Sequence, residues 1–244
     1  MNRSAFLVFF AASSLAAQQR TIEAKDVAVF NRSVSALSDG TRKGVRLNDQ
    51  PGEGVAYLKG IEFSNGTLEF DVRGKDVQGQ SFVGVAFHGL DSTTYDAIYF
   101  RPFNFRTEDP ARRSHAVQYV SQPTYPWQKL RAERPGIFEQ PVSPAPDPNG
   151  WFHVRVVVAS PKVSVFVGDA KEPSLVVNQL SDRTKGLVGL WVGNGSGGDF
   201  VELEDHSPLK PDWRSLLGAC KLRHGQALAR ALRRRGAGDL GAVP

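Results

Sequence analysis

Hydrophobic and polar residues alternate along most of the chain between residues 27 and 204. In the segment Thr67–Arg73, Leu68, Phe70 and Val72 occupy every second position, with polar residues between them. Successive side chains of a β-strand point to opposite faces, so this pattern predicts a strand with one buried face. Ten further segments carry a comparable strand signal: Val45–Leu47, Val55–Leu58, Phe82–His88, Tyr95–Phe103, Ala116–Ser121, Trp151–Ala159, Val163–Val167, Ser174–Val177, Leu187–Val192 and Phe200–Leu203.

These short strands follow one another without helices of ordinary length between them. Many strands without crossover helices favour an all-β fold, and we predict a two-sheet antiparallel jelly-roll sandwich over residues 18–204. Ser160 and Pro161 form a turn signal, so the strands on either side of them are expected to pair as a hairpin. The glycine-rich sequence at 193–199 is likewise expected to be a hairpin loop.

One long segment, Gln122–Asn149, breaks the pattern. It contains seven prolines, which cannot donate a backbone hydrogen bond, so it is not expected to form a regular ladder. A connection of this length inside a compact domain is either functional or an ordered filler loop, and the sequence leaves both open.

The two ends differ from the body of the chain. Residues 1–17 place Arg3 before an apolar run and small residues, which predicts a signal peptide and a secreted or periplasmic protein. The alternative is a buried N-terminal helix. The run is too short for a transmembrane anchor. Residues 205–244 form a basic, partly helical or disordered tail, either an amphipathic helix that contacts a membrane surface or protein partner, or a solvated extension.

Charge and cysteine content exclude several classes of function. The net charge of +5 lies entirely in the segment from Asp205 onwards, which has 8 Lys/Arg and 3 Asp/Glu, so the body is balanced and no nucleic-acid partner is expected. Cys220 is the single cysteine of the sequence, which excludes an intrachain disulfide and a cysteine-based zinc site. No metal ligands and no cofactor are predicted. A structural calcium ion is conceivable but cannot be assigned, because the aspartates show no EF-hand spacing.

Six stretches carry a resemblance to a known group: NGTLEFDVRG (65–74), FVGVAFHG (82–89), YDAIYFRPFNF (95–105), HAVQYVSQPTYPWQKLR (115–131), WFHVRVVV (151–158) and GLVGLWVGNGSGGDF (186–200). Over about residues 27–204 the chain resembles the concanavalin A-like lectin and glucanase superfamily. Within it, the chain is most similar to the 3-keto-disaccharide hydrolase domains of bacterial secreted proteins, and also to laminin G-like modules. The resemblance implies a jelly-roll sandwich whose concave sheet faces carbohydrate.

The glucanases of this superfamily use a Glu-x-Asp-x-x-Glu strand. Glu69 and Asp71 match its first two acidic positions, but position 74 is Gly, so the general acid is missing and the mechanism is not transferred. We expect Glu69 and Asp71 to be solvent-facing residues of a half-buried strand. The resemblance to the 3-keto-disaccharide hydrolases suggests a substrate class but identifies no catalytic residue.

A sugar site needs aromatic faces for the apolar side of the ring and planar hydrogen-bonding groups for its hydroxyls. Arg101, in an apolar strand, must reach a ligand or an internal partner, and both remain open; Arg101→Ala is expected to abolish glycan retention without changing the melting temperature. Gln118 is either a ligand contact or an interstrand amide. The full set of candidate substrate-binding residues is His88, Tyr99, Arg101, Asn104, Gln118, Tyr125, Trp127 and Arg131.

Other residues are given structural roles. Trp191 is expected in the core, and His115 and His153 at the surface of strands. Catalytic residues stay unassigned, with Glu133 and Glu139 as acid–base guesses. The sequence therefore predicts a secreted carbohydrate-active sandwich with a glycan ligand, in which glycoside hydrolysis is open. The alternative is a laminin G-like adhesion or structural module that binds a protein partner.

Overall fold

The structure, a computed structural model, describes residues 21–206. Within this range fourteen strands form two antiparallel sheets of seven strands each, so the predicted all-β sandwich is confirmed. The first sheet has the order β1 (Val27–Phe30), β4 (Gly54–Phe63), β13 (Gly186–Val192), β6 (Val83–Gly89), β7 (Tyr95–Phe100), β8 (Val117–Gln122) and β9 (Glu139–Gln140). The second has the order β12 (Leu175–Asn178), β11 (Lys162–Val167), β10 (Phe152–Ala159), β5 (Gly66–Arg73), β14 (Gly198–Asp205), β3 (Arg42–Leu47) and β2 (Val34–Asp39).

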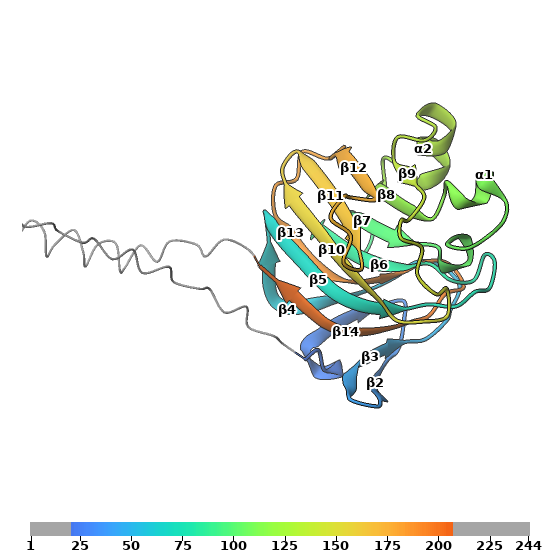
Figure 1. Ribbon diagram of the computed structural model, residues 1–244. Helices are drawn as coiled ribbons and strands as arrows, with labels where there is room; N and C mark the ends of the chain where they lie inside the picture. The colour runs from blue at the N-terminus through green and yellow to red at the C-terminus, as the bar shows by residue number, and fades with distance from the viewer. Residues whose placement is uncertain (1–20, 207–244) are drawn as a thin grey trace, which may run out of the picture. The chain divides into compact units, whose positions relative to one another are not determined.

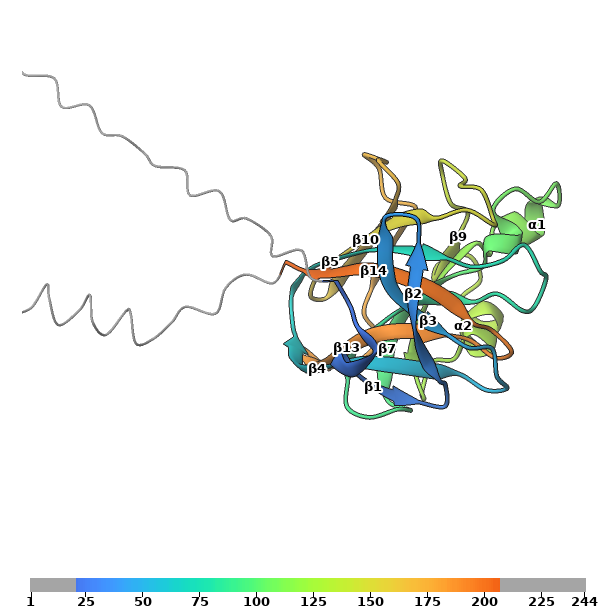
Figure 2. The ribbon, with the colours of Figure 1, turned by 90° about the horizontal axis from the view of Figure 1, so that it is seen from below.

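The two sheets are stacked face to face and enclose the hydrophobic core (Figures 1 and 2). In β5, alternate residues are buried, and each buried residue lies beside a buried residue of β10, as in the pair Phe70 and Val154. Phe100 of the first sheet packs edge-on against Phe152 of the second, with ring centroids 5.4 Å apart. The period-two pattern of the sequence therefore marks the core side of these strands.

Several predicted boundaries change. The hairpin of β10 and β11 is confirmed, but the glycine-rich sequence at 193–199 links β13 of the first sheet to β14 of the second and is not a hairpin loop. The strand predicted to reach Phe103 ends at Phe100, because Pro102 cannot donate to the ladder and begins the 3-10 helix η2 (Pro102–Asn104). The strands β1, β2 and β9 were not predicted.

Helices interrupt the long proline-rich connections. α2 (Trp127–Glu133) lies inside the segment that was expected to be loop, and α1 (Pro110–Arg113) precedes β8. A further 3-10 helix, η1 (Ala24–Asp26), precedes β1. α1, α2 and β9 gather at one end of the sandwich (Figure 1).

The outer face of the first sheet is filled by the protein's own aromatic rings. Tyr99 stacks on Trp191 with centroids 4.8 Å apart, and Trp191 Nε1 donates a hydrogen bond of 3.0 Å to the Tyr95 hydroxyl. Tyr95 in turn donates to the Glu53 carboxylate. All three rings are at most 3% exposed. The expectation of an open, solvated concave face across this sheet is therefore wrong at its centre.

His88 does not share a face with Tyr99. The register of β13 with β6 shifts between Leu187 and Gly189, and His88 has a φ of 50°, so an extra residue rotates its side chain inward. Its ring is fully buried, stacks on Phe63 and lies 2.7 Å from the Ser64 carbonyl oxygen. Burial lowers the pKa of His88 below its usual 6.5.

The predicted signal peptide and most of the predicted tail lie outside the described residues, and both remain predictions. The tail was expected to begin at Asp205, but this residue is the last of β14. Among residues 21–206 no helix has the length and apolar character needed to cross a membrane.

Candidate functional site

Three neighbouring cavities surround the connection between β5 and β6, residues 74–82. The first, here called the aromatic pocket, measures about 320 Å3 and is lined by Gln78, Gly79, Phe82, Arg101, Phe103, Asn104, Arg112, His115, Trp127 and Arg131. The second, the side pocket, measures about 220 Å3 and shares Phe103 and Arg112 with the first. The third, the polar pocket, measures about 450 Å3 and includes Gly74 and Lys75.

Helix α2 supplies one wall of the aromatic pocket. Pro126 occupies its N-cap position with extended backbone angles, so the helix begins directly at Trp127. Trp127 and Arg131 are four residues apart and therefore lie on one helical face, where the Arg131 Cζ is 4.8 Å from the centre of the Trp127 ring. Leu130 on the same helix is buried and anchors this wall to the core.

A buried carboxylate lies beneath the pocket. Glu139 of β9 is 3% exposed, and Arg131 donates two hydrogen bonds to it, of 2.8 and 2.6 Å. His115 Nδ1 lies 3.0 Å from Glu139 Oε1, without making a hydrogen bond. Burial, together with the nearby guanidiniums of Arg131 and Arg101, lowers the pKa of His115 below its usual 6.5, although Glu139 acts in the opposite direction.

Arg101 forms the floor of the pocket and has internal partners. Its guanidinium donates to the His115 carbonyl oxygen (2.8 Å), the Tyr99 hydroxyl (2.8 Å) and Gln118 Oε1 (3.2 Å). Its nearest carboxylate oxygen, on Glu139, is 3.9 Å away. Burial lowers the pKa of Arg101 below its usual range and raises the pKa of Tyr99 to about 12. We predicted that Arg101→Ala would not change the melting temperature. This prediction is revised, because the guanidinium is part of the packing.

The mouth of the pocket carries polar groups with spare hydrogen-bonding capacity. Asn104 is 4% exposed; its Nδ2 donates 3.3 Å to the His115 carbonyl oxygen, and its Oδ1 has no hydrogen-bond partner among the described residues. Arg112, in the last turn of α1, donates one hydrogen bond of 3.1 Å to the Phe103 carbonyl oxygen. A ligand can therefore meet both a buried acceptor and a guanidinium here.

The structure brings half of the predicted binding residues into the aromatic pocket. Arg101, Asn104, Trp127 and Arg131 line it, and these come from two segments of the chain, the η2 turn and α2. The other four predicted residues take different places.

Tyr99 and Gln118 lie under the guanidinium of Arg101, and both are buried. Gln118 also donates to the Phe138 carbonyl oxygen, which is the interstrand amide role that the sequence left open. Tyr125 is outside the lining, where Lys129 and Arg134 approach its ring, and His88 is in the interior.

Six lining residues were not among the predicted set: Gln78, Gly79, Phe82, Phe103, Arg112 and His115. His115 was expected at a strand surface, but it precedes β8 and is held against Glu139. Phe82 was visible as the aromatic residue that opens a predicted strand. No short-range pattern in the sequence marks Arg112, because the α1 turn brings it to the pocket only in the folded chain.

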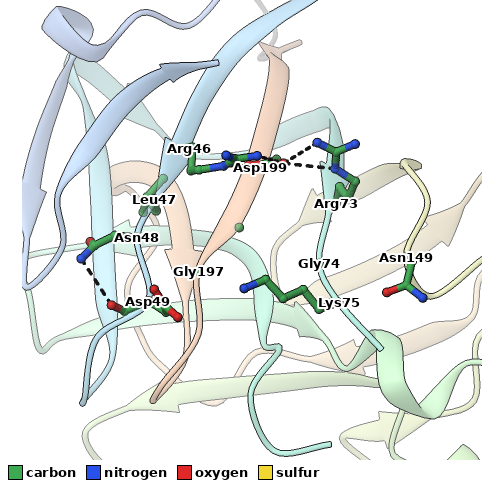
Figure 3. A pocket seen from close by; sticks show the side chains of 11 residues that line it. Arg46, Leu47, Asn48, Asp49, Arg73, Gly74, Lys75, Asn149, Gly197 and Asp199 are labelled. Carbon is green, nitrogen blue, oxygen red and sulfur yellow. Dashed lines mark hydrogen bonds and ion pairs between the residues drawn. The ribbon is translucent and has the colours of Figure 1, made fainter. Parts of the chain in front are cut away.

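The polar pocket lies beside the start of the same connection (Figure 3). Arg46 and Arg73 converge there on Asp199, with hydrogen bonds of 2.6 and 2.7 Å. Burial tends to raise the pKa of Asp199, but the two guanidiniums outweigh it and hold that pKa below 3.8. Lys75 extends into the pocket, and the eleven described residues that line it include no aromatic ring.

The acidic pair of the glucanase motif is on the outer face of the second sheet and lines none of these three cavities. Asp71 lies 2.9 Å from His153 Nδ1, and the side chains of both residues are partly exposed, as expected for solvent-facing positions. Glu69, Glu204 and His206 also lie here, with potential ligand atoms within 4.8 Å of one another, so they could hold a cation. The ion pair between Glu204 and His206, at 3.0 Å, accounts for part of this clustering.

No family model and no curated protein matches this sequence. Solved structures do share the fold. One is the carbohydrate-binding module CBM66 from Bacillus subtilis, which is 14% identical and covers 76% of this chain and 98% of its own, with a TM-score of 0.52. Another is a Bacillus subtilis protein of unknown function with a galectin-like fold. It is 10% identical and covers 75% of this chain and 90% of its own, with a TM-score of 0.51. At these identities the likeness shows the fold alone.

Proposed function

We propose that this protein is a carbohydrate-binding β-sandwich and that its ligand occupies the aromatic pocket. The observation that carries the proposal is the composition of that pocket, where Trp127, Phe82 and Phe103 lie beside guanidinium and amide groups. The faces of aromatic rings pack against the apolar side of a sugar, and planar polar groups bind its hydroxyls. The volume of the aromatic pocket, about 320 Å3, lies within the usual range for small-molecule sites.

The fold supports this proposal indirectly. One solved structure with the same fold is described as a carbohydrate-binding module, and the whole of that module is matched apart from a few residues, at 98% coverage. The polar pocket is larger, but its two arginines are bound to Asp199, and the part of the chain that the structure describes contributes no ring to its lining. We therefore place the sugar in the aromatic pocket.

The geometry favours binding over hydrolysis. Glycosidases of the usual kind need two carboxyl groups about 5–9.5 Å apart across a groove. None of the described residues lining the aromatic pocket has a carboxylate. Glu139 lies beneath the pocket and is held by Arg131, and Glu133 is exposed at the end of α2. We accordingly expect no release of sugar from 3-keto-glucosides or from plain glucans.

The test is retention in native gels that contain soluble polysaccharides, compared for the wild type and two tryptophan variants. Trp127→Ala removes the pocket ring and should weaken retention about tenfold, from lost stacking and apolar contact of roughly 1.4 kcal/mol. Trp151→Ala is the matched control, because Trp151 lies against Arg73 on the second sheet and does not line the aromatic pocket. Thermal melting confirms that both variants are folded.

Equal retention of the Trp127→Ala variant would place any sugar outside this pocket. No retention of the wild type by a broad panel of neutral and acidic polysaccharides would overturn the proposal and favour the adhesion module that binds a protein partner. Export remains a separate prediction: N-terminal sequencing of the mature protein should begin near Gln18.

A further inference from the structure

The aromatic pocket and the side pocket share Phe103 and Arg112 and carry an excess of positive charge. Four arginines line them together: Arg101, Arg106, Arg112 and Arg131. The carboxylates at hand are Asp76, in the lining of the side pocket, and Glu139, below the aromatic pocket. A ligand in this double cavity therefore meets more cations than anions.

Glu139 is already engaged by one of these arginines. Arg131 takes both of its oxygens in a bidentate pair, a geometry that satisfies the carboxylate. Arg101 is 3.9 Å from the same carboxylate, but its hydrogen bonds go to neutral acceptors. One buried carboxylate thus lies close to two guanidiniums and is hydrogen-bonded to one of them.

Arg112 is the arginine with the most remaining capacity. Among the described residues, its guanidinium makes one hydrogen bond, to the Phe103 carbonyl oxygen, and no ion pair. A guanidinium carries five N–H donors and prefers planar, bidentate anions. Arg106 likewise donates to a carbonyl oxygen, that of Ala145. Arg112, which lines both pockets, and Arg106, which lines the side pocket, are therefore hydrogen-bonded only to neutral groups.

The buried charge of Arg101 also favours an anionic ligand. Its side chain is 6% exposed, and a buried cation without a hydrogen-bonded anion is unfavourable unless another charge approaches it. An anionic group entering above Trp127 would approach Arg101 and Arg112 together. Asn104 Oδ1, buried and without a hydrogen-bond partner among residues 21–206, would accept a hydrogen bond from a neighbouring hydroxyl.

We propose that the ligand is an acidic saccharide, whose carboxylate or sulfate group is bound at Arg112 while a sugar ring lies against Trp127. This inference rests on the proposed carbohydrate binding and assigns the class of sugar. A carboxylate and a sulfate present the same anionic oxygens to a guanidinium, so the structure names their shared chemistry and experiment distinguishes them.

The experiment is isothermal titration of the full chain with three probes at matched length: an oligogalacturonate, a sulfated galactan oligosaccharide and a neutral galactan oligosaccharide. We expect at least one acidic probe to bind about tenfold more tightly than the neutral one. Raising the salt concentration should reduce that advantage, because counter-ions screen partly exposed charges.

Adjacent arginines supply a matched pair of variants. Arg112→Gln should lower the affinity for the acidic probe about tenfold and lower that for the neutral probe much less, because only the anionic group loses an ionic partner. Arg113→Gln removes the same charge from the next residue, which is exposed and outside the lining, and should change neither affinity. Both variants alter a short surface helix, so folding should be retained, as thermal melting will show.

The outcomes separate the two proposals. Equal affinity for acidic and neutral probes, or equal loss in the two arginine variants, would overturn the acidic-saccharide inference while carbohydrate binding stands. Absence of binding by all three probes, together with no retention on the wider polysaccharide panel, would overturn both. Preference for the uronate or for the sulfated probe would identify the anionic group.

Discussion

Glu139→Gln tests whether the buried carboxylate organises the pocket. The change keeps the shape of the side chain but removes the charge that accepts two hydrogen bonds from Arg131 and faces Arg101 at 3.9 Å. Removing one partner of a fully buried ion pair costs about 3–5 kcal/mol. The Arg131 side chain is 33% exposed and can be partly rehydrated, so we expect a cost below that range, about 2–3 kcal/mol.

The assay is urea unfolding followed by tryptophan fluorescence, with thermal melting as a second measure. For a domain of this size about 1 kcal/mol corresponds to roughly 2–4 °C, so the midpoint should fall by about 5–10 °C. Glu133→Gln is the control, because Glu133 is exposed at the end of α2, and it should stay within about 0.5 kcal/mol of the wild type. A Glu139→Gln variant as stable as this control would show that the buried carboxylate does not organise the pocket.

Three further predictions concern Arg101, Asp199 and His115. Arg101→Ala should lower the free energy of unfolding by about 2–3 kcal/mol, because the hydrogen bonds to Tyr99 and Gln118 are lost; an unchanged denaturation curve would contradict the packing role. Asp199 has a lowered folded-state pKa, so its stabilisation is complete above about pH 3.8 and is lost as the pH falls through that pKa; acid titration of Asp199→Asn should show a shallower loss than the wild type, and equal slopes would count against it. His115, which faces Glu139, Arg101 and the Arg131 guanidinium, has a pKa below 6.5, so affinity for an acidic sugar should rise as the pH falls through that pKa. His115→Asn should abolish that rise in titrations.

Much of the fold follows from local patterns. All eleven predicted strands are present. Alternation marks those with one buried face, as at Leu68, Phe70 and Val72, whereas β6 and β7 are buried at every position and were indicated by their apolar content. It missed β1 and β2, whose buried positions are few and irregular. It also missed α2, because seven residues between prolines are too few to establish a helical period.

The candidate site was predictable in residue type and only partly in position. Rings and guanidiniums near Trp127 and Arg131 were indicated by the sequence, and helical spacing explains why those two meet. His88 was misplaced because a β-bulge reverses its side, and counting alternate residues cannot detect an extra residue. Long-range packing brings Arg112 to the pocket and Glu139 beneath it, and no short motif encodes either position.

The most direct test of the central claim is the response of the tryptophan indole N–H signals to sugar. In 15N-labelled protein, with signals assigned by Trp127→Phe and Trp151→Phe, addition of the oligogalacturonate should shift the Trp127 indole resonance. Trp151, whose Nε1 donates to Asp39 on the second sheet, should keep its signal in place. A shift at Trp151 with none at Trp127 would contradict the account, and so would unchanged spectra with acidic and neutral oligosaccharides alike.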